Sequence, residues 1–152
     1  MIFLGVDPGV NGTMTIITSK RQWVMTISFS GLSTMQISRY LDLSDYDDEA
    51  FCVLERVHAM PSKFRGSSSS WELAESFSML KTILTLRGVP FSQVLPERWQ
   101  KELKLPAKGD KTYDAHKKVL HQRAQALYPK ANLLKGTADS LLIAEYARRT
   151  FK

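Results

Sequence analysis

The sequence is poor in the features that mark secreted and membrane proteins. It has one cysteine, Cys52, so no disulfide can form within the chain, and its place in an apolar run predicts a small buried residue. No apolar stretch approaches the length that crosses a bilayer, and the first residues lack the basic, apolar and small-residue succession of a signal peptide. We therefore expect a cytoplasmic protein with no membrane partner.

Internal repeats and interdomain linkers are also absent. The chain has 152 residues, of which 43% are hydrophobic, enough for one domain with a core and too few for two. We expect residues 1–152 to form a single domain. With 21 basic and 15 acidic residues the net charge is +6, which favours a polyanionic partner such as nucleic acid without specifying it.

Five runs of apolar and β-branched residues predict strands. The runs 2–6 and 13–17 are separated by turn-forming residues and predict a hairpin, and alternation over 22–29 predicts a third antiparallel strand. The continuous run 51–55 is typical of a buried strand with a parallel neighbour. A last strand is expected over 91–95.

Helices are expected between and after the later strands. The long one begins at a capping box over 69–72 and ends near Arg87, and Asp110 is a candidate cap for a helix that ends at Leu127. Further helices are predicted over 33–41, over 97–103 and from Thr137 onward. Crossovers between parallel strands must be covered, so we expect an α/β fold: a mixed five-stranded sheet, three antiparallel strands then parallel ones, with helices on both faces.

Three carboxylates stand where this topology can bring them together. Asp7 ends the first strand, Glu55 ends the fourth, and Asp139 lies in the first turn of the last helix. Each has a simpler explanation, as a turn residue, a surface residue or a helix N-terminal acid. Clustered like charges need cations to neutralise them, however, and carboxylate oxygens suit Mg²⁺ or Mn²⁺, so we expect a two-metal site.

The same residues lie in segments that resemble the RuvC family of Holliday junction resolvases, especially its phage-type members. The likeness is ordered and spans nearly the whole chain. It rests on the segments Gly5-Val6-Asp7-Pro8-Gly9, Leu54-Glu55-Arg56-Val57-His58-Ala59-Met60-Pro61, Val94-Leu95-Pro96-Glu97-Arg98-Trp99-Gln100-Lys101 and Ala138-Asp139-Ser140-Leu141-Leu142-Ile143-Ala144. The resemblance implies one RNase H-like nuclease domain over 1–152, a homodimer, and paired metal-dependent nicks on a four-way DNA junction.

Carried over by position, the resemblance makes Asp7, Glu55 and Asp139 the catalytic residues and the ligands of two Mg²⁺ or Mn²⁺ ions per active site. Many relatives carry another carboxylate or a histidine about three residues before the last aspartate, where this chain has Gly136. The chain would then hold one metal with an extra water, borrow another carboxylate, or bind junctions while cutting them poorly. Glu145 is six residues beyond Asp139, roughly opposite on a helix, and is not expected to substitute.

Candidate DNA contacts lie in two basic loops. In the first loop an aromatic between two cations could stack on an unpaired base while the cations hold phosphates, as an aromatic does in the family. The candidates are His58, Lys63, Phe64, Arg65, Lys108 and Lys111. The simpler alternative is an exposed aromatic among solvated charges.

The expected function is a structure-selective, Mg²⁺-dependent endodeoxyribonuclease that resolves four-way or branched DNA junctions by phosphodiester hydrolysis. Its task would be recombination, repair or debranching of phage DNA, in the host cytoplasm if the chain is phage-encoded. One alternative is a junction-binding protein with weak or no cleavage, because Gly136 replaces a ligand. Others are an RNase H-type activity on RNA–DNA hybrids and an actin-like phosphotransferase, for which a second domain copy is lacking. Cleavage preference and the metal used in the cell stay open.

Overall fold

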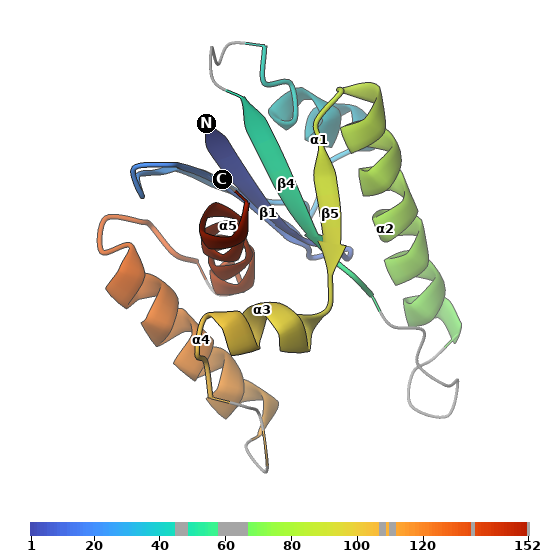
Figure 1. Cartoon of the computed structure of the whole chain (residues 1–152). Coiled ribbons are helices and arrows are strands. Elements are labelled where there is room, and N and C mark those ends of the chain that lie inside the picture. The colour runs from blue at the N-terminus through green and yellow to red at the C-terminus, as the bar shows by residue number, and fades with distance from the viewer. Residues whose placement is uncertain (45–48, 58–66, 107–108, 110–111, 135, 152) are drawn as a thin grey trace.

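The structure is a computed structural model that describes residues 1–44, 49–57, 67–106, 109, 112–134 and 136–151, without the side chains of 67–69. Three strands begin the chain, and three helices end it (Figure 1). In chain order they are β1 (Ile2–Asp7), β2 (Thr13–Thr18), β3 (Trp23–Ser28), α1 (Thr34–Tyr40), β4 (Ala50–Glu55), α2 (Ser67–Leu86), β5 (Phe91–Val94), α3 (Pro96–Glu102), α4 (Tyr113–Leu127) and α5 (Ala138–Thr150).

The strands form one mixed sheet in the order β3-β2-β1-β4-β5. β2 pairs antiparallel with both β1 and β3, whereas β4 runs parallel to both β1 and β5. The predicted mixed five-stranded sheet is therefore confirmed. Because β1 and β4 are parallel neighbours, with Val6 opposite Leu54, their carboxyl ends lie at the same edge of the sheet.

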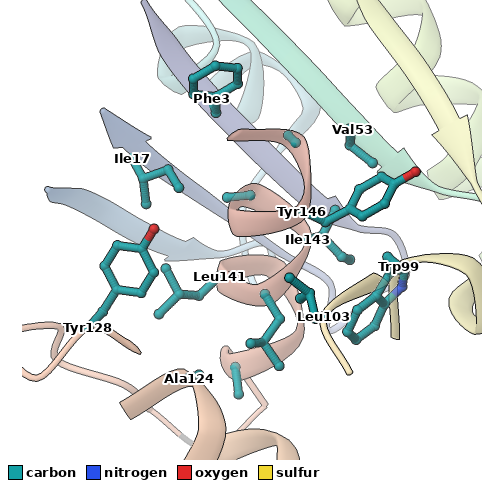
Figure 2. Close-up of a cluster of buried hydrophobic side chains, with 14 of the residues drawn as sticks. Phe3, Ile17, Val53, Trp99, Leu103, Ala124, Tyr128, Leu141, Ile143 and Tyr146 are labelled. Atoms are coloured by element: carbon teal, nitrogen blue, oxygen red, sulfur yellow. The ribbon is translucent and has the colours of Figure 1, made fainter. Parts of the chain in front are cut away.

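Helices cover both faces of the sheet, as expected. Successive residues of a strand point to opposite faces, so Phe3 packs with one layer of helices and Leu4 with the other. The Phe3 layer takes side chains from α3, α4 and α5, and Figure 2 shows Leu141 and Ile143 of α5 among them. The Leu4 layer takes side chains from α1 and α2, so each face of the sheet has its own apolar core.

α5 lies directly against the backbone of β1. A Cβ added to Gly5 would stand 2.1 Å from the carbonyl oxygen of Ser140 and 2.2 Å from the amide nitrogen of Ala144. Only glycine permits this approach. The contact places the first turn of α5, and with it Asp139, beside the central strand.

Glu145 points away from the carboxyl edge into a separate polar cluster. It is fully buried, accepts a 2.6 Å hydrogen bond from Tyr128 Oη, and pairs with Arg148 and Arg149. Burial opposes its ionisation, but the donors on Arg148, Tyr128 and Arg149 outweigh that effect and lower its pKa to about 2. The expectation that Glu145 does not replace a site ligand agrees with this placement.

Two helix starts differ from the sequence prediction. α2 begins at Ser67, ahead of the predicted capping box over 69–72, so the backbone is already helical where the cap was expected. α4 is capped by Thr112, whose hydroxyl accepts from the amide of Ala115 at 3.3 Å, in place of Asp110. Of the helices that the structure describes, none combines the length and hydropathy needed to span a bilayer.

Candidate active site

A cleft of about 610 Å³ opens at the carboxyl edge of β1 and β4. Asp7 from β1, Glu55 from β4 and Asp139 from α5 all line it, together with Lys117 from α4. The structure thus brings the three predicted carboxylates to one place from segments far apart in sequence. Their catalytic role stays a prediction.

Burial and mutual repulsion disfavour the charged forms of two of these carboxyl groups. Burial raises the pKa of Asp7 to about 7, with repulsion from Asp139 adding to the effect and Lys117 opposing it. Burial and repulsion from Asp7 together raise the pKa of Glu55 to about 8. Both groups are therefore held partly protonated near neutral pH unless a cation joins them.

Asp139 is the most deeply placed of the three. Its side chain is 9% exposed, and Oδ2 accepts a hydrogen bond from Lys117 Nζ. Oδ1 is buried with no hydrogen-bond partner among the residues described. A buried carboxylate oxygen without a partner is costly, so this atom is suited to receive a ligand.

The donor set fits a hard divalent cation. Mg²⁺ and Mn²⁺ prefer carboxylate oxygens, and the unpartnered Oδ1 of Asp139 together with Asp7 and Glu55 provides them at one cleft. Within the described ranges, no three or more His, Cys, Asp or Glu side chains are already grouped closely enough to hold an ion.

Trp99 fixes the orientation of Glu55. Its indole Nε1 donates a 2.7 Å hydrogen bond to Glu55 Oε2, and its ring is buried in α3 against the sheet. This bond lowers the pKa of Glu55 against the larger effect of burial. Sequence reasoning gave Trp99 no role, although the tryptophan stands in one of the family-like segments.

α2 holds the turn that follows Asp7. The amide of Gly9 donates to Ser76 Oγ at 3.0 Å, and the same hydroxyl donates to the carbonyl of Gly9 at 3.3 Å. Gly9 has a φ of +138°, in the region that favours glycine. Ser76 was missed from sequence, because nothing in the helical pattern distinguishes it from its serine neighbours.

A chain of buried hydroxyls holds the first turn of α5 beneath the site. Ser140 Oγ donates to the carbonyl of Thr137 at 3.1 Å and lies 2.9 Å from Thr13 Oγ1 and 2.8 Å from Thr15 Oγ1. A further 2.9 Å contact joins Thr15 to Thr26 of β3. The turn that carries Asp139 is thus tied to β2 and β3 by polar contacts as well as by packing.

Gly136 adjoins the cleft without a side chain to offer it. It has a φ of +89°, and a Cβ added there would meet nothing within 4 Å. A second pocket of about 580 Å³ is lined by Gly136, Asp139 and Lys117. The position of the ligand that the family resemblance led us to expect is therefore open and lies next to a lysine.

The predicted DNA contacts lie outside the residues that the structure describes. They are His58, Lys63, Phe64, Arg65, Lys108 and Lys111. Their role stays a prediction from sequence.

No protein-family model matches the chain, and no curated protein matches it in sequence. Solved structures do match. Thermus thermophilus RuvC in complex with a Holliday junction substrate superposes with a TM-score of 0.66 at 14% identity, over 99% of this chain and 97% of that one. A second Thermus thermophilus RuvC structure gives 0.67 at 14% identity, over 98% and 96%. The chain therefore has an RNase H-like fold of the RuvC type over nearly its whole length, as the sequence predicted. These matches do not bear on the phage-type likeness.

Proposed function

We propose that this chain is a metal-dependent endodeoxyribonuclease that resolves four-way or branched DNA junctions. One observation carries the proposal: three carboxylates from β1, β4 and α5 line a single cleft on a RuvC-like fold, and one of their buried oxygens has no protein partner among the residues described. Carboxylates in such an arrangement are suited to hold Mg²⁺ or Mn²⁺.

Each carboxylate has a distinct part in this proposal. Asp7, on the central strand, and Asp139, on α5, would hold the metal in the cleft that both line. Glu55, kept in place by Trp99, would complete the ligation and orient the attacking water. A divalent ion bound there would supply positive charge to the attacking and leaving oxygens of the phosphodiester.

The partner is proposed to be DNA. The net charge of +6 suits a polyanion, and the structural neighbour was solved with a Holliday junction substrate. A junction with near two-fold symmetry calls for two active sites, so a homodimer that makes paired nicks belongs to the proposal. The phage-type assignment rests on the sequence segments alone.

A cleavage assay tests the proposal. Purified chain would be incubated with a labelled four-way junction, a linear duplex and an RNA–DNA hybrid, each with Mg²⁺, Mn²⁺ or EDTA. Paired nicks confined to the junction, dependent on metal and absent in Asp7→Asn, are expected. Cleavage of the hybrid in preference to the junction would instead indicate an RNase H-type activity.

A junction-binding protein with weak or no cleavage is the second candidate. The observation that favours it is Gly136, which offers no side chain at the place of the expected fourth ligand. Retention of the junction in a gel-shift assay, without nicks under either metal, would support this alternative and overturn the nuclease.

A further inference from the structure

A lysine stands inside the carboxylate cluster. Lys117 reaches from α4, its Nζ donates to Asp139 Oδ2, and it also attracts Asp7 and Glu55 across the cleft. Its side chain is 31% exposed, and the ammonium lies 5.4 Å from the centre of the Tyr113 ring. The lysine is thus held by an ion pair and a cation–π contact, unlike a solvated surface lysine.

Formal charge limits how many cations this cleft can take. Four carboxylates line the cleft, Asp7, Glu55, Glu72 and Asp139, and Arg56 and Lys117 neutralise two of their four negative charges. The remaining two are balanced by a single divalent ion. A second divalent ion would leave the cluster with an excess of positive charge at close range, which is unfavourable in a partly buried site.

The glycine at position 136 also favours one bound ion over two. A site for two ions needs more oxygen ligands than a site for one, and the chain offers none at Gly136. The acidic and basic residues that line the pocket at Gly136 are Asp7, Asp114, Lys117, Lys118, His121 and Asp139. The ammonium of Lys117 therefore lies on the side of the cluster where Gly136 offers no ligand.

We propose that Lys117 takes the place of a second metal ion, so that each active site holds a single divalent cation. The inference rests on the proposed function and deepens it by setting the metal stoichiometry, in place of the two ions expected from the family resemblance. Lys117 would supply fixed positive charge beside Asp139, and the one bound ion would be held by Asp7, Glu55 and the free Oδ1 of Asp139.

The number of bound ions can be measured without any cleavage. Mn²⁺ would be titrated into the full chain, with bound ions counted by electron paramagnetic resonance and by calorimetry. One Mn²⁺ per chain is expected for the wild type and for Lys117→Arg, which keeps the charge. Two are expected for Lys117→Glu, which removes the positive charge and adds a carboxylate ligand. Lys101→Glu, at an exposed lysine of α3, is the matched control and should bind one.

Two ions per wild-type chain would overturn the inference, and this result does not depend on any variant folding. A single ion in folded Lys117→Glu would overturn it as well. The proposed function is judged separately: one bound ion without junction nicking would contradict the nuclease and leave the stoichiometry intact, whereas two ions with junction nicking would do the reverse. No bound ion in the wild type would overturn both.

Discussion

Individual carboxyl groups in the cleft are held in an unfavourable state. Asp7 and Glu55 are buried close to one another and to Asp139, and Lys117 and Trp99 provide the described contacts that favour charge there. Such groups stabilise the folded chain when protonated and destabilise it when ionised. Their burial is therefore better explained by a ligand that they bind than by a contribution to folding.

The stability of the metal-free chain should fall as pH rises. Asp7 and Glu55 have folded-state pKa values of about 7 and about 8, above their ordinary values of 3.8 and 4.5, so the folded chain keeps protons that the unfolded chain has released. The resulting stability is fully present below about pH 4 and is lost as pH rises through the two folded-state values. In EDTA, the urea midpoint is expected to decrease between about pH 5 and about pH 9.

The double variant Asp7→Asn with Glu55→Gln provides the control for that titration. It removes both groups while keeping similar volume, so its midpoint should change less with pH over the same range. An equally steep decrease in the double variant would show that other groups are responsible. Mn²⁺ added near pH 8 should restore the midpoint of the wild type only.

Trp99→Phe should disturb Glu55 without emptying the core. The change removes the donor to Glu55 Oε2 and leaves an aromatic ring in α3, so the pKa of Glu55 should rise further. We expect the midpoint of Mn²⁺ binding to move to higher pH and the free energy of unfolding to fall by about 1–3 kcal/mol. An unchanged pH dependence of Mn²⁺ binding would mean that Trp99 acts through packing alone.

Among the elements, the packing of α5 against β1 determines where the site forms. Their backbones approach so closely at Gly5 that no other residue fits between them, and the hydroxyl of Ser140 ties the same turn to β2. The first turn of α5 therefore has little freedom to move relative to the end of β1. Asp7 and Asp139 are placed by this contact.

Gly5→Ala should be strongly destabilising. Its Cβ would meet backbone atoms of Ser140 and Ala144, which cannot move aside as a side chain could, so α5 would have to shift. We expect a loss of about 3 kcal/mol or more in chemical denaturation. Gly88→Ala is the matched control: its φ is +66° but nothing lies within 4 Å of the added Cβ, so a loss of about 1 kcal/mol is expected. Equal losses in both variants would refute the close approach.

Ser76→Ala tests whether α2 positions the turn after Asp7. The variant loses both hydrogen bonds to Gly9, and we expect a stability loss of only about 1 kcal/mol. Because the turn carries Asp7, Mn²⁺ affinity should fall by about 10-fold, in the range seen when a group supporting a metal ligand is removed. Ser78→Ala, at an exposed serine of the same helix, should change neither quantity. Unaltered Mn²⁺ affinity in Ser76→Ala would exclude the positioning role.

Sequence patterns predicted the elements better than their ends. Apolar runs with β-branched residues indicated all five strands, and the continuous run of β4 indicated its parallel partner, because burial on both faces leaves no polar alternation. Helix starts were less well determined. Thr112 and Asp110 are both good caps, and Ser67 to Ser70 all suit a cap or a first turn, so local preference alone does not select between them.

For the whole molecule, the order of apolar and polar residues was enough to predict the fold, although the sequence identity to the matching solved structures is only 14%. The same order led to Asp7, Glu55 and Asp139, because strand ends and a helix start can be read from it. Lys117, Trp99 and Ser76 were not found in this way. Their roles depend on which side chain meets which across the sheet and between helices, and a helical period does not encode that information.

Asp7, Glu55 and Asp139, from three elements, are proposed to act as one metal-dependent active site. The most direct test measures single-turnover nicking of a four-way junction, in Mg²⁺ and in Mn²⁺, by Asp7→Asn, Glu55→Gln and Asp139→Asn. Glu102→Gln, at an exposed acidic residue of α3, serves as the control. Each of the three variants is expected to lose at least about 100-fold in rate, more than an outer contact of a metal site contributes, and Glu102→Gln should keep the wild-type rate. Wild-type nicking by any one of the three would show that these carboxylates do not form one active site.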